Sequence, residues 1–555
     1  MRSRLTALAL AALVACAVAR VALAAGADMI LFNGKIITVD DQFSIAQAVA
    51  IADGRIVAVG RDEDLKRDFA GPQVRQVDLG GRTVVPGLMD GHIHLFRGAE
   101  FWRSEVRLDG VTSRSAAGDL IRGHAQATGK GTWILTLGGW TEKQFGDDRR
   151  PFNRADLDLL APDNPVFMQL GYGRGYANTP ALQQAGIKIE DKSATDRDVV
   201  ERDNAGVATG LVSSLRGIAM IRRAVGKGDR EDRGPGLHAI MSALNEIGVT
   251  AVYDPGGFGL KPEDYKSLES YARSGQSTVR VYRSLWVETP TLADVPKTVT
   301  AIHEARGFAG DDVYDLIAVG ETVYSPLHDN FQMPLKPSAE ERQAITAIFK
   351  ATAERGLQFH LHAIEHDTVS VYLDAIESVA AGHNIRPLRW TFAHTWNLTP
   401  DQIERMRRLG IGIALQSGSS FDDTRTRVAG EAGYQMPSLR VVQESGLTWG
   451  LGTDATVVGL TNPFITLGWA VTGAMPNGQV TNKATVTREQ ALIAHTRSNA
   501  FLAFRENTIG SLQPGKLADL VVLDRDYLTV PANEIWRIRP VATMLAGKVV
   551  FGRLP

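Results

Sequence analysis

Eight short apolar segments between about Val84 and Ala500 are the feature that most limits what this 555-residue chain can fold into. Amphipathic stretches of helical periodicity lie between them, and such alternation is typical of a parallel α/β arrangement. Eight is also the number of strands that a (β/α)8 TIM barrel requires. We therefore expect an α/β barrel over residues 83–500, with strands at 83–94, 248–256, 278–287, 313–321, 357–362, 389–394, 411–416 and 448–454.

Two further regions surround this barrel in the sequence. The distance from the first to the second segment is far too long for one strand–helix unit, so residues of about 97–240 are expected to form an insertion over the barrel mouth. Both ends of the chain alternate apolar and polar residues, with hairpin signals at Asn33-Gly34 and Asp53-Gly54. We expect residues 28–82 and 501–555 to build one small antiparallel β-sandwich.

The first 24 residues have the pattern of an export signal: arginines, an Ala- and Leu-rich run, and small residues at Ala22 and Ala24. A transmembrane anchor fits less well, because Arg20 interrupts a run already shorter than the ~20 residues that span a bilayer. "LVAC", ending at Cys16, resembles a lipoprotein processing site and leaves a lipid-anchored form as the alternative. We expect an exported protein of the bacterial periplasm, without a stable transmembrane span.

Composition excludes several classes of partner. The formal net charge is −2 and no long basic run is present, so nucleic acid is not an expected ligand. Cys16 is the only cysteine and precedes the expected mature domains, which excludes disulfides and thiolate metal ligands there. A small-molecule substrate is the expected partner, and the sequence leaves a homo-oligomer open.

Several expected strands end in residues that can bind a metal. In a parallel barrel all these ends lie on one rim, so residues hundreds of positions apart converge. The candidate ligands are His92, His94, Glu321, His362, His394 and Asp454.

Each candidate also has a plainer interpretation. Of His360 and His362, one is structural or supports a ligand, and we favour His362 as the ligand. Glu321 also fits a helix cap or a surface ion pair, Asp454 a helix N-cap, and His394 a buried histidine bonded to a carbonyl. Their joint placement favours a metal site over coincidence.

Specific motifs extend this interpretation to a family. They are "VVPGLMDGHIH" ending at His94, "WILTLGGW" (133–140), "PVFMQL", "ANTPAL", "GVTAVYD", "HAI", "FAHTW", "LGTDA" (451–455) and "IGSLQPGKLADLVVLDRD" (509–526). With them the chain resembles the amidohydrolase superfamily, and specifically the family-3 amidohydrolases that include N-substituted formamide deformylases. The resemblance covers nearly the whole mature chain. It implies a distorted (β/α)8 barrel with a flanking β-sandwich formed by both termini.

The resemblance also implies roles for single residues. His92 and His94 would bind one metal, His362 and His394 a second, and Asp454 would touch the first metal and handle the proton. Relatives often carry a carboxylated lysine at the fourth strand, whereas this chain reads "LIAVGETVY" and offers Glu321 as a bridging carboxylate instead. "HAIEH" and "LGYGRGYAN" also depart from the family pattern, which affects the substrate more than the reaction class.

The expected function is hydrolysis of an amide or related acyl-nitrogen bond by metal-bound hydroxide, with Asp454 as the catalytic residue. One or two divalent ions are expected, with zinc as the default, although the ligand types also suit manganese, iron or nickel. Ester or C–C hydrolysis, or a lyase step, would use the same site, and a non-catalytic exported binding protein on this scaffold is the other alternative. Most aromatic residues of the insertion are expected to form its core, and Trp140 is the one assigned to substrate binding.

Overall fold

The computed structural model describes residues 26–191, 197–226, 228, 232–329, 335–418 and 424–555. The expected signal segment 1–24, with Cys16, lies outside the described residues. Within them, no helix combines the length and the apolar composition that crossing a membrane requires.

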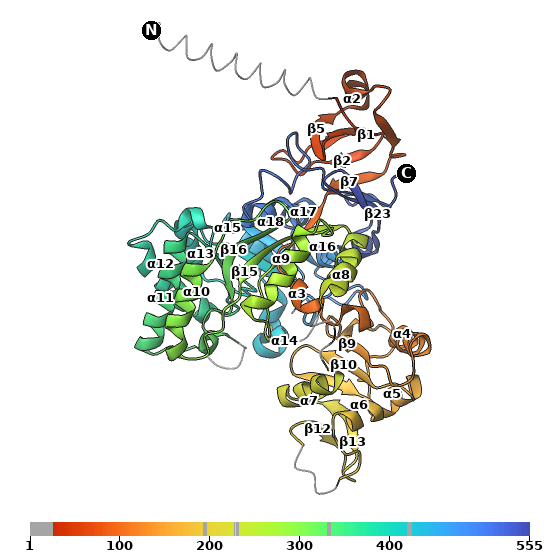
Figure 1. The fold of residues 1–555 in the computed structure, drawn as a ribbon, viewed down its shortest axis with the longest axis vertical. Helices are drawn as coiled ribbons and strands as arrows, with labels where there is room; N and C mark the ends of the chain where they lie inside the picture. The colour runs from red at the N-terminus through yellow and green to blue at the C-terminus, as the bar shows by residue number, and fades with distance from the viewer. Residues whose placement is uncertain (1–25, 192–196, 227, 229–231, 330–334, 419–423) are drawn as a thin grey trace.

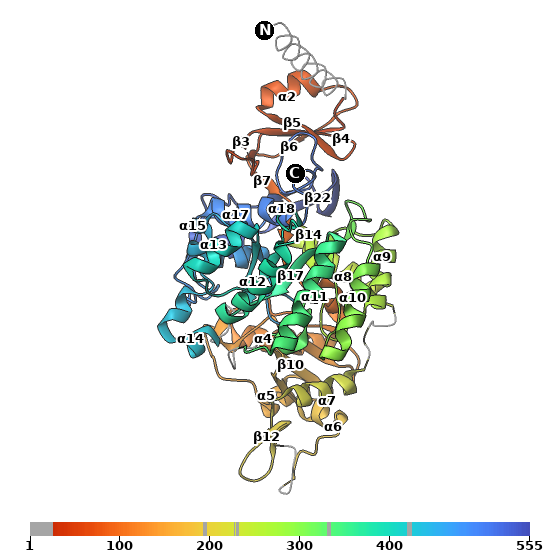
Figure 2. The same ribbon diagram turned by 90° about the vertical axis from the view of Figure 1, so that its left-hand side faces the viewer.

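Eight parallel strands form the central sheet, with helices packed around its outside (Figures 1 and 2). In chain order and in spatial order they are β8 (Leu88–Asp90), β14 (Val249–Asp254), β15 (Arg280–Leu285), β16 (Tyr314–Glu321), β17 (Gln358–His362), β18 (Thr391–Ala393), β19 (Gly412–Gln416) and β20 (Trp449–Gly452). The expected α/β barrel is therefore confirmed.

Side-chain bonds complete the barrel between β20 and β8, where few backbone bonds join the strands. The Gly91 N–H donates to the Leu451 carbonyl over 3.0 Å. Asp90 accepts hydrogen bonds from the Thr453 N–H at 3.0 Å and the Thr453 hydroxyl at 2.6 Å. Asn499 donates from Nδ2 to the carbonyls of Met89 and Leu451, each over 2.7 Å. These bonds connect β20 and β8 at the point where the strand ladder is incomplete.

The outer helices have sequence-encoded ends. They are α8 (Gly234–Glu246), α9 (Tyr265–Arg273), α10 (Val295–Glu304), α11 (Ala339–Arg355), α12 (His366–Ala380), α13 (Pro400–Leu409), α15 (Leu439–Ser445), α16 (Pro463–Thr472), α17 (Arg488–Ala494) and α18 (Arg497–Leu502). For example, Ser338 and Glu341 form a capping box at the start of α11, and Gly356 ends it with a φ of 70°. These helices cover the apolar outward-facing side chains of the strands, such as Phe359 and Leu361.

The two ends of the chain form two sheets at one end of the barrel (Figure 1). One sheet has the order β5-β4-β1-β6 and the other β23-β22-β21-β7-β2-β3. Their apolar faces share one core that includes Leu31, Val84, Leu520 and Met544. The strands are β1 (Met29–Phe32), β2 (Lys35–Ile37), β3 (Ile45–Ala46), β4 (Ala48–Ala52), β5 (Arg55–Gly60), β6 (Arg75–Asp78), β7 (Thr83–Pro86), β21 (Leu520–Leu523), β22 (Pro540–Leu545) and β23 (Lys548–Gly552).

Two details differ from the sequence expectation. Asp53-Gly54 does form a hairpin turn between β4 and β5, but Asn33-Gly34 carries the chain from one sheet into the other. As a result β1 pairs with β6 and β2 with β7 in parallel, so the sheets are not purely antiparallel. The expected strand 83–94 is also divided at Gly87 into β7, which belongs to the terminal sheet, and β8, which belongs to the barrel.

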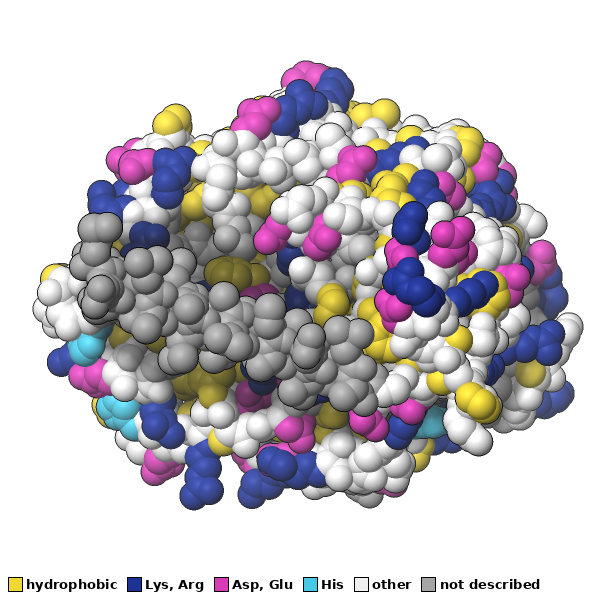
Figure 3. Space-filling model, turned by 90° about the horizontal axis from the view of Figure 1, so that it is seen from above, with side chains coloured by type: hydrophobic (Ala, Val, Ile, Leu, Met, Phe, Trp, Pro, Cys, Tyr) yellow, Lys and Arg dark blue, Asp and Glu magenta, His cyan; other side chains and the backbone are white. Residues whose placement is uncertain are grey.

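A buried ion pair joins the terminal sheets to the barrel. Arg280 at the start of β15 donates from Nε and Nη2 to the two carboxylate oxygens of Asp519, over 2.6 and 2.9 Å. Both side chains are 3% exposed. Seen from the end of the molecule that carries the terminal sheets, acidic and basic side chains are interspersed among the visible described residues (Figure 3).

The insertion lies at the opposite end of the barrel from the terminal sheets (Figures 1 and 2). Its five-stranded sheet has the order β12-β13-β11-β10-β9. The strands are β9 (Ile134–Leu137), β10 (Val166–Leu170), β11 (Arg174–Ala177), β12 (Val200–Arg202) and β13 (Ala208–Val212), with helices α4 (Arg114–Ala127), α5 (Arg154–Leu160), α6 (Thr179–Gln184) and α7 (Leu215–Val225). Because the insertion follows β8, it covers the carboxyl ends of the barrel strands.

Candidate active site

The rim at the carboxyl ends of the strands brings together the six residues that the sequence singled out as ligands. His92 and His94 follow β8, Glu321 and His362 end β16 and β17, His394 follows β18, and Asp454 lies two residues after β20. Their side chains are at most 11% exposed. Period-two alternation puts His92 and His94 on one side of the chain, which is why the HxH pattern could be interpreted from sequence.

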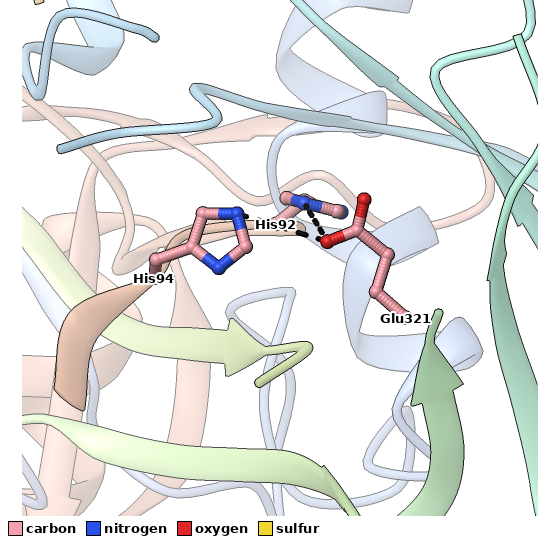
Figure 4. Close-up of side chains that lie close together, drawn as sticks. All are labelled: His92, His94 and Glu321. Atoms are coloured by element: carbon pink, nitrogen blue, oxygen red, sulfur yellow. Dashed lines mark ion pairs between the residues drawn. The ribbon is translucent and has the colours of Figure 1, made fainter. Parts of the chain in front are cut away.

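Glu321 stands between two pairs of histidines. Its Oε2 atom lies 3.7 Å from Nε2 of His92 and 3.7 Å from Nε2 of His94, and both rings face it in Figure 4. Its Oε1 atom lies 2.7 Å from Nδ1 of His362 and 2.9 Å from Nε2 of His394. Within each of the two groups, the candidate ligand atoms lie within 4.8 Å of one another. One carboxylate therefore belongs to two ligand clusters.

Asp454 faces both clusters. Its Oδ1 atom is 3.3 Å from Nε2 of His94 and 3.7 Å from Nε2 of His92, and its Oδ2 atom is 3.8 Å from Nδ1 of His394. The Asp454 N–H donates to the His92 carbonyl over 2.9 Å, which fixes the backbone beside the histidines. The next helix, α16, is capped by Asn462, so the N-cap interpretation of Asp454 does not describe its position.

Three groups that were not assigned as site residues hold the ligand rings from behind. Nε2 of His360 shares a 2.9 Å hydrogen bond with Nδ1 of His92. Nδ1 of His94 lies 2.5 Å from the Gly256 carbonyl. Asp329 Oδ1 lies 2.9 Å from Nε2 of His362. The second HxH pattern pointed to His360, whereas Asp329 sits in a loop whose sequence carries no comparable signal.

Gly320 allows this arrangement on the strand that carries Glu321. Its φ is 147°, and a Cβ atom at this position would lie 2.0 Å from the His360 carbonyl oxygen. Only glycine fits this close approach of β16 to β17. Gly320, which precedes Glu321, is thus constrained by the backbone of His360, the residue whose ring supports His92.

The protonation states follow from burial and from these contacts. Burial by itself raises the pKa of Glu321. The hydrogen bonds from His362 and His394 lower this pKa by more than burial raises it, so it ends well below the ordinary value. Burial holds the pKa of His92 well below its ordinary value, and the pKa of His360 falls to about 3 for the same main reason. Both rings are therefore neutral at physiological pH, as metal binding by imidazole requires.

The surroundings of one atom, Nε2 of His92, indicate whether the cluster fits a metal. Nε2 of His92 is buried and has no hydrogen-bond partner among the described residues, although the carboxylates of Glu321 and Asp454 face it at 3.7 Å. A buried polar atom without a partner is unfavourable, and a cation between it and the carboxylates would satisfy all three groups. The residues present fit a divalent ion.

The family comparison agrees with this geometry. The sequence model of the amidohydrolase family matches residues 75–551 of the chain. The chain belongs to the amidohydrolase family. This confirms the family resemblance, and with it the enzyme class, because members of the family are metal-dependent hydrolases that act on carbon–nitrogen bonds.

Two curated relatives match most of the length of this amidohydrolase. The protein LONG AFTER FAR-RED 3 of Arabidopsis thaliana is 27% identical over 556 residues, which cover 95% of this chain and 92% of that protein. An N-substituted formamide deformylase of Arthrobacter pascens is 24% identical over 542 residues, with 95% and 98% covered.

Solved structures share the fold. An uncharacterized metal-dependent hydrolase from Pyrococcus furiosus superposes with a TM-score of 0.62 at 22% identity, over 90% of this chain and 100% of that one. Atrazine chlorohydrolase from Arthrobacter aurescens, complexed with zinc, gives 0.51 at 16% identity, over 94% and 95%. At these identities the likeness concerns the fold alone.

Trp140 lies in the core of the insertion. It is 6% exposed, packs against Phe145, Phe152 and Tyr176, and donates from Nε1 to the Gln169 carbonyl over 2.8 Å. It also borders a cavity of about 580 Å³ between the insertion and residues that follow β19 and β20. Trp140 thus has the packing role expected of most aromatics here, and its assignment to substrate binding stays a prediction.

Proposed function

We propose that this amidohydrolase cleaves an amide or related acyl-nitrogen bond at a centre of two divalent metals. The observation that carries the proposal is the shared carboxylate of Glu321, whose two oxygens face separate histidine pairs. His92 and His94 would hold one ion, His362 and His394 the other, and Glu321 would contact both.

The ligands also suggest which metal binds. Imidazole and carboxylate suit zinc, and the atrazine chlorohydrolase that shares the fold was crystallised with zinc. When bound, such ions lower the pKa of water from 15.7 towards ~7 and polarise the carbonyl of the substrate. We propose zinc for this chain.

Asp454 is the proposed catalytic residue. Its carboxylate faces both histidine pairs, so it is placed to accept the proton of the attacking water and to pass it to the leaving nitrogen. The substrate would enter through the cavity of about 580 Å³. Gly418 lines this cavity, and a Cβ atom at Gly418 would lie 3.3 Å from the Cβ atom of Asp454.

The test pairs metal content with turnover in Asp454→Asn. The variant should bind metal but lose at least 100-fold in kcat, because a general base contributes about 100- to 10 000-fold. Asp401→Asn, on the exposed outer surface of α13, is the matched control and should behave as wild type.

The substrate panel should contain formyl, acetyl and benzoyl amides together with the corresponding esters. Full activity of Asp454→Asn would remove its proton-transfer role. Turnover of esters alone would replace the C–N assignment with ester hydrolysis. A purified protein with less than about half an equivalent of metal would favour a non-catalytic binding protein, given the affinity of a preformed site.

We also propose that the protein is exported to the bacterial periplasm by its first 24 residues. The composition of this segment supports the proposal. Mass spectrometry of the protein recovered from the periplasm should give a chain that starts at Ala25. A diacylated chain starting at Cys16 would replace this with membrane anchoring.

A further inference from the structure

Arg97 is a cation beside the candidate metal centre that no part of the proposed mechanism uses. It lies in α3 (Leu95–Gly98), which begins directly after His94. A Cβ atom at Gly257 would lie 3.4 Å from Cδ of Arg97 and 3.6 Å from Nδ1 of His94. The stem of Arg97 and the ring of His94 therefore pack against the same short stretch of backbone.

Asp254 keeps these two segments in place. Its Oδ2 atom accepts a hydrogen bond from the Phe96 N–H, and its Oδ1 atom accepts one from the Gly256 N–H, each over 2.9 Å. Asp254 is fully buried at the end of β14. The position of Arg97 is thus set by the barrel itself rather than by a free surface loop.

The hydrogen-bonding capacity of the Arg97 guanidinium is only partly used within the described residues. Its Nε and Nη2 atoms are buried and have no hydrogen-bond partner in the part of the chain that the structure describes. No carboxylate of the described residues makes an ion pair with it within 4.0 Å. Its polar surroundings are the Tyr172 hydroxyl and, farther away, the carboxylates of Asp454 and Glu321.

Metal binding would increase the need of the Arg97 charge for a partner. The two carboxylates that now balance Arg97 at a distance are the ones that would face the metal ions. Once cations compensate them, Arg97 is left as a partly buried positive charge whose buried Nε and Nη2 donors are unused, and buried charged groups are normally paired. An anion that arrives with the substrate would supply the pairing.

An aromatic wall runs from the centre towards the insertion and lies next to Arg97. The ring of His328 lies 3.9 Å from that of the ligand His362, and the ring of Phe258 lies 5.5 Å from His328 and 6.3 Å from Tyr172. Arg97 lies over Tyr172 at 5.5 Å. Tyr172 and Phe258 are 40% and 48% exposed, which is high for large aromatic residues and is typical of a ligand-binding surface.

We propose that Arg97 binds a carboxylate of the substrate, and that the substrates are acyl-nitrogen compounds that carry this carboxylate together with an apolar, aromatic group. The planar guanidinium can bind a carboxylate through two parallel N–H donors. The wall of Tyr172, Phe258 and His328 then takes the apolar group. This inference rests on the proposed C–N hydrolase function and adds the substrate class.

The first arm of the test measures turnover of matched pairs by the zinc-loaded enzyme. Formyl, acetyl and benzoyl amides of phenylalanine are compared with those of 2-phenylethylamine, which differ only by the carboxylate. Wild type should prefer the acids in kcat/KM by roughly 10- to 100-fold, as a hydrogen bond to a charged group predicts. Arg97→Gln should bring this ratio close to one, mainly through KM.

Two further variants separate specific recognition from general effects. Arg97→Lys keeps the charge but not the planar pair of donors, so its preference should be intermediate. Arg103→Gln, an exposed arginine six residues later, should keep the wild-type ratio. A ratio that Arg97→Gln leaves unchanged, or a wild-type preference for the neutral amides, would overturn the inference while the hydrolase function stands.

The second arm does not depend on turnover. Calorimetry compares phenylacetate with phenylacetamide on the zinc-loaded protein, because phenylacetate carries the two groups that the site should recognise. Arg97→Gln should weaken phenylacetate binding at least 10-fold and leave phenylacetamide unchanged. If no amide in the panel is hydrolysed, the proposed function fails. The calorimetry alone then tests whether Arg97 binds a carboxylate. Equal phenylacetate affinities in wild type and Arg97→Gln would then refute it.

Discussion

His360→Phe tests whether the ring behind His92 controls metal binding. The change removes the 2.9 Å hydrogen bond between His360 and Nδ1 of His92. A phenyl ring keeps the shape of the site, because His360 stacks on Tyr253 with a centroid distance of 4.3 Å and an angle of 20°. The substitution therefore removes one polar contact without opening a large cavity.

Two arguments give the size of the effect. Nδ1 of His92 is left buried without a partner, which costs about 1–3 kcal/mol and corresponds to about 5- to 150-fold in affinity. Loss of a group that orients a histidine ligand costs about 10- to 100-fold in metal affinity. Both estimates overlap, so we expect the His92/His94 site to bind Zn²⁺ about 10- to 100-fold more weakly.

The assay is a Zn²⁺ titration in competition with a chromophoric chelator. The phase that belongs to the His92/His94 site should shift, and the phase of the His362/His394 site should stay. His360→Gln should recover part of the affinity, since its amide reaches the position of Nε2. His303→Phe, on the half-exposed surface of α10, is the control for losing a histidine. Wild-type affinity in His360→Phe, with an unchanged unfolding temperature, would refute this account of how His92 is held.

Three further predictions concern the shared carboxylate, the ion pair between the sheets, and pH. Glu321→Gln should lower the metal content from two ions to at most one per chain by elemental analysis, because one amide oxygen cannot serve both histidine pairs; two ions in the variant would contradict the bridge. Asp519→Asn breaks the buried pair with Arg280 and should lower the free energy of unfolding by about 3–5 kcal/mol, whereas Glu269→Gln at an exposed pair should lower it by less than about 1 kcal/mol in the same denaturant titration. In chelator-treated protein, burial lowers the pKa of His362 but hydrogen bonds to two carboxylates raise it to about 10, so its stabilising charge is fully present below pH 6.5 and is lost as pH rises through 10. Unfolding temperatures should fall across that window, and His362→Gln should flatten the fall; a parallel fall in the variant would assign the effect elsewhere.

The features that the sequence could predict are those that follow from the regular alternation of side chains and of secondary-structure elements along the chain. The eight barrel strands are apolar runs of the right length, and ligands at strand ends converge because parallel strands share one rim. The paired histidines at 92 and 94 were visible because side chains alternate along an extended chain. The six rim residues lie together in the structure as this reasoning expects.

Contacts that depend on loops and on long-range register could not be predicted in this way. Asp329 and Arg97 lie outside any strand, and their contacts with His362 and Tyr172 depend on how the segments between the strands fold. Asn33-Gly34 has the sequence of a hairpin turn that would pair β1 with β2. Instead β2 pairs with β7 and so belongs to the other sheet. Local patterns indicate which residues form turns and which form strands. The partner with which each strand pairs is decided by the tertiary fold.

The position of β7 has a consequence for how the chain is made. This strand, Thr83–Pro86, lies between β2 and β21, so one of its neighbours arrives only with the segment 520–555. Until then the N-terminal half exposes an unpaired strand edge, which is a known route to aggregation during synthesis. A chain shortened before Leu520 should therefore accumulate in inclusion bodies even though its barrel and metal ligands are complete.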